Sequence, residues 1–280
     1  MPRSRPNPKN KKKGGNIETQ THSKENTNQS QQLIHQDVPI NKVKPTFSRP
    51  FISVVTPTYN RRKFIPYAIK CFEHQTYPRE LMEWVIIDDG EDKIEDLVKD
   101  VPGVKYFPYD EKIKLGRKRN IMHEKCNGDI IVYFDDDDYY PPERVATAVM
   151  KLQSNKEALA AGSSRLHIYF KHIDKIYEFG PYGPRHSTAG TFAIKRELLK
   201  QTRYEDDAVI AEEKQFLKNY TIPFVQLPAE KTILVCSHDQ NTFDKKILLN
   251  QGESKFMRET SLKIKQFIKN KELREFYKNA

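Results

Sequence analysis

From residue 51 onward, short apolar runs alternate with stretches in which apolar residues recur every three or four positions. Residues 51–55 form a β-branched run that Pro57 ends, and residues 62–74 then place their apolar side chains on one side of a helix. The same alternation predicts strands at 84–87, 104–107 and 129–134 and helices at 94–98 and 115–125. Strands and helices that alternate at this spacing predict an α/β fold with a mainly parallel sheet flanked by helices.

The second half of the chain is less regular. Residues 165–170 and 176–179 are typical of a hairpin or an edge pair. Further elements are expected as strands at 191–194, 224–227 and 232–236, as helical stretches at 196–201 and 212–220, and as a Lys-rich amphipathic helix at 257–277. The pattern predicts one folded domain over residues 49–250, followed by an amphipathic helical tail over residues 251–280.

Residues 1–48 lack apolar periodicity and are rich in Lys, Asn, Gln, Thr and Ser, which predicts a disordered basic tail. The formal net charge of the 280 residues is +10, and this tail holds nine basic and three acidic side chains, hence six of those ten charges. The folded part is therefore only mildly basic, which argues against specific nucleic-acid recognition. Peripheral contact of the two basic ends with a membrane surface stays open.

Three cysteines, at 71, 126 and 236, are too few and too widely spaced for a disulfide framework or a structural zinc site. The sequence also lacks the run of about 20 apolar residues that would span a bilayer, and its first residues lack the apolar core of a signal peptide. We expect a soluble, cytoplasmic protein.

Polar clusters follow three of the expected strands, at residues 56–60, 88–89 and 135–138. The carboxyl ends of parallel strands meet at one edge of a sheet, where such folds bind ligands. The third cluster consists of four consecutive aspartates, Asp135 to Asp138, and alternation along an extended chain would put Asp135 and Asp137 on the same face. Adjacent buried carboxylates repel one another, so a hard divalent cation with oxygen ligands, Mg²⁺ or Mn²⁺, is expected among them.

In this order the clusters resemble the family 2 glycosyltransferases, from about residue 51 to residue 217. The matching segments are the opening strand and turn at 53–61, the second strand motif at 85–90, a Gly-x-x-x-Asn helix at 116–120 and a DXD segment at 134–138. The resemblance implies a GT-A fold, with a Rossmann-like nucleotide-binding half and an acceptor half in a single mixed sheet. It also implies a nucleotide-diphosphate sugar as donor, inversion at the anomeric carbon, and a glycan or other hydroxyl compound as acceptor.

The resemblance also implies roles for individual residues. Thr56 and Asp89 match positions that hold the base of the donor, and Asp137 matches the aspartate that ligates the metal. Asp135 or Asp136 would approach the ribose or the diphosphate, and Arg119 is a further candidate for the donor site.

The resemblance further implies that the catalytic base lies in an acidic pair that opens a helix. Residues 211–217 are similar to that segment, which places Glu213 at the base position, while Glu212 and Asp207 remain competitors because the commoner Glu-Asp pair is missing. The resemblance makes His238, which follows an expected strand late in the chain, a candidate second metal ligand. Some GT-A enzymes complete the metal site with a histidine in such a place, and imidazole suits Mn²⁺.

The sequence thus predicts a metal-dependent inverting glycosyltransferase. A sugar nucleotidyltransferase would share the carboxylates but should carry a Gly-rich phosphate loop after its first strand, and residues 56–62 contain no glycine. The dinucleotide and P-loop glycine signatures are missing as well. A catalytically inactive carbohydrate- or nucleic-acid-binding protein on a GT-A scaffold is the alternative from a different class, with the basic tail as its main support.

Overall fold

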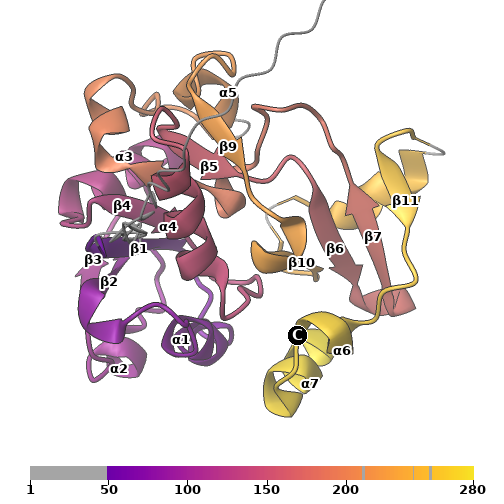
Figure 1. The fold of residues 1–280 in the computed structure, drawn as a ribbon. Helices are drawn as coiled ribbons and strands as arrows, with labels where there is room; N and C mark the ends of the chain where they lie inside the picture. Colours follow the sequence, from indigo (N-terminus) through magenta and orange to yellow (C-terminus); the bar gives the residue numbers. More distant parts are fainter. Residues whose placement is uncertain (1–48, 210–211, 242, 252–253) are drawn as a thin grey trace, which may run out of the picture. The chain divides into compact units, whose positions relative to one another are not determined.

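The computed structural model of the protein describes residues 49–209, 212–241, 243–251 and 254–280. The basic tail predicted over residues 1–48 lies outside the described residues. Two sheets are seen, a larger one on the left of Figure 1 and a smaller one on its right.

The larger sheet has seven strands in the order β3-β2-β1-β4-β8-β5-β9. Strands β3, β2, β1 and β4 run parallel, β8 is antiparallel to both of its neighbours, and β5 and β9 are parallel. This confirms the predicted mainly parallel sheet. The bounds of its strands are β1 Ile52–Thr58, β2 Met82–Asp88, β3 Val104–Pro108, β4 Ile130–Tyr133, β5 Ala160–Gly162, β8 Ala193–Lys195 and β9 Phe224–Gln226.

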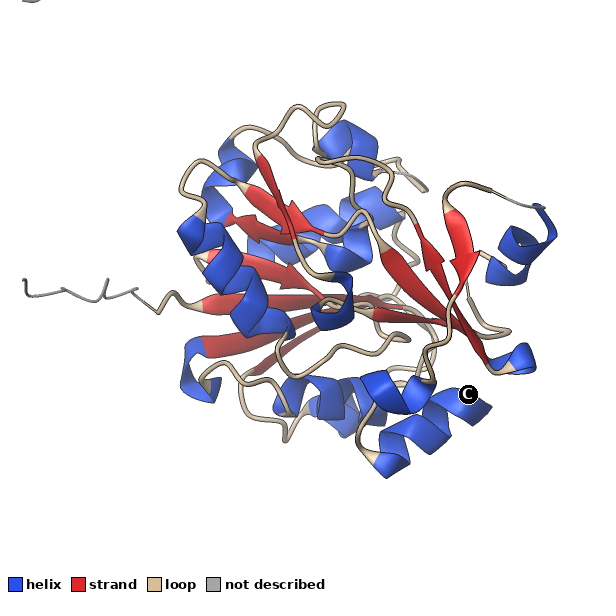
Figure 2. Cartoon of the chain, turned by 45° about the vertical axis from the view of Figure 1, so that its right-hand side comes forward, coloured by secondary structure: helices blue, strands red, loops and turns tan. Residues whose placement is uncertain are grey.

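Helices cover both faces of the larger sheet, as Figure 2 shows. Side chains alternate between faces along a strand, so Ile52 and Val54 pack toward α1, α2 and α4, whereas Val55 and Ile131 pack toward α3 and α5. Strands buried on both faces consist of apolar residues without alternation, which is how they could be recognised in the sequence. The helices are α1 Ile65–Glu73, α2 Glu95–Val98, α3 Leu115–Lys125, α4 Arg144–Ser154 and α5 Glu213–Phe216.

The smaller sheet has four strands in the order β10-β6-β7-β11 and was not expected from the sequence. The predicted pair at 165–170 and 176–179 forms its centre as antiparallel β6 and β7, while β10 joins β6 in parallel. A smaller sheet thus accompanies the expected mainly parallel one, because β10 pairs with β6 instead of joining the larger sheet. The bounds are β6 Leu166–Phe170, β7 Lys175–Phe179, β10 Leu234–Ser237 and β11 Met257–Glu259.

Three local predictions were wrong. Strand β1 continues through Pro57 to Thr58, which is possible because its pairing with β4 has already ended at Val55. The helix expected at 212–220 stops at Phe216, and residues 218–220 all take positive φ. In place of one helix over 257–277, the chain forms β11 and then the helices α6 Ile264–Phe267 and α7 Lys271–Asn279.

Short 3-10 helices connect several of these elements: η1 Arg79–Leu81, η2 Lys171–Ile173, η3 Ala189–Thr191, η4 Arg196–Lys200, η5 Ala229–Lys231 and η6 Lys245–Gln251. Among the described helices, none combines the length and the apolar character that crossing a bilayer requires. The three cysteines are buried and free.

Candidate active site

A cleft of about 540 Å³ opens beyond the carboxyl ends of β1 and β4, where the larger sheet faces β6 and β10 of the smaller one. Strand β1 pairs with β2 on one side and with β4 on the other, so the chain leaves the sheet in opposite directions at this point. Such a switch point is where α/β sheets bind ligands. A hollow of about 650 Å³ at the amino ends of β1 to β3 holds a single buried carboxylate, Glu83, which Lys105 and Ser53 already pair.

Four consecutive aspartates line the cleft directly after β4. Burial raises the pKa of Asp135 to about 6, against the opposing charge of Arg119. Burial, followed by the charge of Asp137, raises the pKa of both Asp136 and Asp138 well above the usual value. These carboxylates therefore lack the positive charge that would let them all ionise together.

Asp137 differs from its neighbours. Burial alone would raise its pKa, but the hydrogen bond from His238 and the charge of Lys245 outweigh burial and hold the pKa below the usual value. Its Oδ2 lies 3.1 Å from His238 Nε2 and 3.3 Å from Asn241 Nδ2. Ionisation is therefore easier for Asp137 than for its three neighbours.

His238 contacts Asp137 but does not line the cleft itself. The backbone N–H of Gln240 donates to His238 Nδ1 at 3.2 Å, and a proton on Nε2 would then point to Asp137. The ring packs against Phe64 with centroids 4.6 Å apart. In this arrangement His238 holds the Asp137 carboxylate in place.

Four cationic side chains line the same cleft: Arg61, Lys118, Arg119 and Lys245. Arg61 Nε lies 3.8 Å from Asp136 Oδ1 and 3.7 Å from Asp137 Oδ2. Arg119 Nη1 is buried without a hydrogen-bond partner among the described residues. An arginine that is half-satisfied and lines a cleft can still bind an anion there.

Thr56 and Asp89 lie behind the cleft lining. Thr56 is fully buried within β1, and its Oγ1 accepts a hydrogen bond from Trp84 Nε1 at 2.8 Å. The Asp89 carboxylate pairs with Lys118 and accepts the backbone N–H of Ile113 at 2.6 Å. Of these two predicted donor-site residues, Asp89 reaches the cleft through Lys118, whereas Thr56 contacts only the core.

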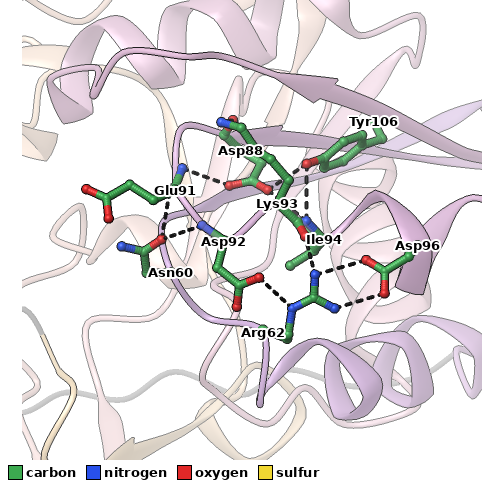
Figure 3. Close-up of polar contacts among 10 residues, drawn as sticks. Asn60, Arg62, Asp88, Glu91, Asp92, Lys93, Ile94, Asp96 and Tyr106 are labelled. Carbon is green, nitrogen blue, oxygen red and sulfur yellow. Dashed lines mark hydrogen bonds and ion pairs between the residues drawn. The ribbon is translucent and has the colours of Figure 1, made fainter.

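The loop after β2 is fastened to the turn after β1, as Figure 3 shows. Asn60, at a positive φ of 53° that this residue type tolerates, accepts the backbone N–H of Glu91 at 2.8 Å through Oδ1. Arg62 forms two hydrogen bonds to the Asp96 carboxylate, at 2.9 and 3.0 Å, and one to Asp92 at 2.8 Å. Asp88 belongs to this network through Tyr106, so only the second aspartate of the 88–89 pair is directed toward Lys118.

The three candidate bases lie in different environments. Glu213 lines the cleft, and its Oε1 accepts the backbone N–H of Ala189 at 2.9 Å. Burial, and next the charge of Glu212, raise the pKa of Glu213. Glu212 accepts a hydrogen bond from Arg119 Nε at 2.7 Å, and Asp207, whose side chain is 88% exposed, pairs with Lys114 at the surface.

The sequence profile of glycosyl transferase family 2 matches residues 53–219, which is more than half of the chain. The chain belongs to glycosyltransferase family 2. The matched segment contains the aspartate run and Glu213, whereas His238 and Lys245 lie beyond it.

Among relatives, a glucosyl-dolichyl phosphate glucuronosyltransferase of Haloferax volcanii is 29% identical over 119 residues, which cover 40% of this chain and 37% of that protein. A GalNAc(5)-diNAcBac-PP-undecaprenol beta-1,3-glucosyltransferase of Campylobacter jejuni is 28% identical over 109 residues, which cover 36% of this chain and 34% of that protein. The chain spans less than half the length of the curated relatives that it matches.

Two solved structures share the fold. The mannosyltransferase PcManGT of Pyrobaculum calidifontis, in complex with GDP-Man and Mn²⁺, has a TM-score of 0.55 at 17% identity and covers 70% of this chain and 59% of that one. Residues 1–349 of TarS of Staphylococcus aureus, in complex with UDP-GlcNAc, have a TM-score of 0.52 at 20% identity and cover 68% of this chain and 59% of that one. The fold of the family 2 domain is therefore GT-A.

Several cleft residues received no role from the sequence. Arg61 stands in the opening motif and Lys118 in the 116–120 segment, so both could have been found by asking which positive charges follow the strands. Asn241 and Lys245 come from a segment without any recognisable pattern, and only the fold brings them to Asp137.

The aspartate run fits a divalent cation by its chemistry. In the described part of the chain, no three His, Cys, Asp or Glu side chains converge as a ready-made ligand set. The raised pKa values of Asp135, Asp136 and Asp138 nevertheless mark uncompensated carboxylates facing a cleft, which is the environment that a hard cation with oxygen ligands stabilises.

Proposed function

We propose that the protein is a metal-dependent inverting glycosyltransferase that transfers a sugar from a nucleotide-diphosphate sugar to an acceptor hydroxyl. The observation that carries this proposal is the composition of one cleft, which brings Glu213 together with four aspartates and four cationic side chains. Two structural neighbours were solved with nucleotide sugars, GDP-Man and UDP-GlcNAc, which agrees with a donor of that class.

The donor's diphosphate would lie among the cationic side chains. Arg119 has a buried, unpartnered Nη1 at the cleft, and Arg61 and Lys245 stand beside the aspartates. Guanidinium groups bind phosphate through paired N–H donors, so Arg119 and Arg61 are the strongest candidates. Tyr59, which also lines the cleft, offers a ring against which a nucleotide base can stack. Thr56 and Asp89 would then support the base-binding turn from behind, Asp89 through Lys118.

Asp137, with Asp135 or Asp136 beside it, would hold Mn²⁺ or Mg²⁺. A bound divalent cation would supply Lewis-acid neutralisation of the leaving diphosphate. His238 can offer Nε2 as a ligand only after its proton moves to Nδ1 and the Gln240 N–H releases that atom. Until then its role is to orient the Asp137 carboxylate, as residues behind metal ligands commonly do.

Glu213 would take the proton from the acceptor hydroxyl. Among the described residues that line the cleft, it is the one carboxylate outside the aspartate run. A raised pKa brings a carboxylate closer to the range in which it accepts a proton effectively near neutral pH. A single base of this kind suits direct displacement, in which the acceptor oxygen attacks opposite the departing diphosphate and the configuration inverts.

The acceptor would enter along the wall formed by the smaller sheet, where Leu166, Ile168, Ile233 and Val235 line the cleft. Relatives include enzymes named for dolichyl phosphate and undecaprenol-linked substrates, so lipid-linked as well as free glycans belong in an acceptor screen. Contact of the basic ends with a membrane surface stays a prediction.

The test is a panel of nucleotide sugars incubated with the protein and Mn²⁺, with nucleoside diphosphate release measured with and without EDTA. We expect metal-dependent release with one donor class, lost in Asp137→Ala and kept in Glu259→Ala, a surface carboxylate that pairs with Lys175 away from the cleft. Production of a sugar nucleotide from a sugar phosphate would favour a nucleotidyltransferase. Metal-independent binding without turnover would favour an inactive binding protein.

A further inference from the structure

Helix α7 contacts the backbone of the aspartate run. The Tyr277 side chain is buried, and its hydroxyl donates a hydrogen bond to the carbonyl oxygen of Asp138 at 2.9 Å. A buried carbonyl that loses its hydrogen-bond donor bears the cost of an unmade hydrogen bond, so this contact fixes the orientation of the peptide group that follows Asp138.

Strand β10 holds the side chain of the same residue. Asp138 Oδ1 accepts the backbone N–H of Cys236 at 2.8 Å, and Tyr139 exchanges two backbone hydrogen bonds with Leu234, at 2.9 and 3.1 Å. Asp138 is therefore held through its carboxylate by β10 and through its carbonyl by α7. Asp137 immediately precedes this anchored residue in the chain.

A second contact runs from α7 to His238 through aromatic rings. Phe276 stacks on Tyr67 with centroids 3.5 Å apart and meets Phe64 edge-on at 5.6 Å. Phe64 in turn packs against the His238 ring, whose Nε2 lies 3.1 Å from Asp137 Oδ2. Two consecutive residues of α7 thus reach both supports of the Asp137 carboxylate, one by a hydrogen bond and the other by ring packing.

We propose that Tyr277 and Phe276 are positioning residues for the cation site, so that α7, which lies outside the segment matched by the family profile, is a functional part of the cleft. This inference rests on the proposed metal-dependent function. Neither side chain touches the substrates. Each acts through a group that orients Asp137, namely the Asp138 peptide for Tyr277 and the His238 ring for Phe276.

The decisive variant is Tyr277→Phe, which removes one hydroxyl and keeps the ring. Its matched control is Tyr77→Phe, because Tyr77 is also a buried tyrosine whose hydroxyl donates to a backbone carbonyl, that of Pro50 at 2.7 Å, away from the cleft. Mn²⁺ affinity is measured by electron paramagnetic resonance of the free ion, without donor or acceptor, and thermal unfolding is followed in parallel.

We expect the Mn²⁺ dissociation constant of Tyr277→Phe to rise about tenfold, which is the usual effect of losing a group that orients a metal ligand. Tyr77→Phe should lose a similar amount of thermal stability and keep the wild-type dissociation constant. Equal Mn²⁺ affinities in the two variants would overturn the inference. Wild-type protein that binds no Mn²⁺ would instead contradict the proposed metal-dependent function, so the two failures can be told apart.

Phe276→Leu tests the ring contact independently. It should weaken Mn²⁺ binding while Met150→Leu, a change at a solvent-exposed position of α4, leaves that binding unchanged. If Phe276→Leu binds Mn²⁺ as tightly as the wild type, the role of Phe276 is excluded even if that of Tyr277 stands.

Discussion

Arg119 and Glu212 are joined by a hydrogen bond of 2.7 Å from Nε to Oε1, although they stand 93 positions apart in the chain. Their side chains are only 6% and 4% exposed. The carboxylate of Glu212 is thus paired with Arg119, whereas the adjacent Glu213 lines the cleft. One buried ion pair thereby gives two neighbouring glutamates different environments, whereas the sequence placed Glu213 at the base position and kept Glu212 as a competitor.

Replacing Glu213 by Gln should abolish most of the transfer activity. The amide cannot accept the acceptor proton, and a positioned base contributes about 10²- to 10⁴-fold to the rate. Donor binding and Mn²⁺ binding should persist. Asp207→Asn, which changes an exposed carboxylate outside the cleft, is the matched control and should retain full kcat. A fully active Glu213→Gln enzyme would rule this residue out as the base.

The pH dependence of kcat should report the environment of Glu213. Burial and the neighbouring charge of Glu212 raise its pKa, and a base works only when deprotonated, so activity should fall with decreasing pH at a higher pH than for an ordinary glutamate. Glu212→Gln removes the repelling charge and should move this acid limb to lower pH. The profile is measured at saturating Mn²⁺ and donor, and an unmoved limb would contradict the assignment.

The Arg119–Glu212 pair should behave as a unit in stability measurements. Arg119→Leu leaves a buried carboxylate without its partner and should lower the free energy of unfolding by about 3–5 kcal/mol. The double variant Arg119→Leu, Glu212→Leu removes both charges and should regain much of that loss. Urea denaturation of the four proteins of this cycle measures the coupling, and simple additivity would show that the pair is not coupled.

Gly190→Ala should disturb the donor site while leaving the fold intact. A Cβ at this position would lie 2.4 Å from Asp135 Oδ2, so the carboxylate has to move. We expect the donor KM to rise about tenfold, because small displacements of positioning groups are costly in enzyme sites. Gly183→Ala is the matched control, since its Cβ would meet His186 at an ordinary 3.8 Å. Wild-type kinetics for Gly190→Ala would show that Asp135 has no part in donor binding.

Strands β1, β2 and β4 of the larger sheet could be predicted because burial on both faces makes them mainly apolar runs, as in Trp84 to Ile87. Strand β5 could not, because Ala160-Ala161-Gly162 lacks the β-branched residues that mark strands. The smaller sheet could not be predicted from the sequence either. Its β10–β6 pairing joins Leu234 to His167, and no local pattern specifies which of several strands a given strand will join.

The site divides in the same way. Polar residues that directly follow a predicted strand, such as Asp135 to Asp138, could be placed at the cleft from chain order alone. The position of Thr56 behind the cleft lining could not be predicted, because the sequence suggested that the strand stops at Pro57 and the structure continues it to Thr58. The tautomer of His238 depends on a backbone N–H two residues away, which no sequence pattern encodes.

The contacts that fasten Asp138 have a consequence for the order of folding. Its carboxylate is bonded by the N–H of Cys236, 98 positions later in the chain. Its carbonyl is bonded by the hydroxyl of Tyr277, 139 positions later. Closing such long loops is slow compared with pairing neighbouring strands. We therefore expect a refolding chain to pair the strands β1 to β4 before it can bind a cation. In stopped-flow experiments, Mn²⁺ uptake should lag behind the recovery of Trp84 fluorescence and report the completion of the native state.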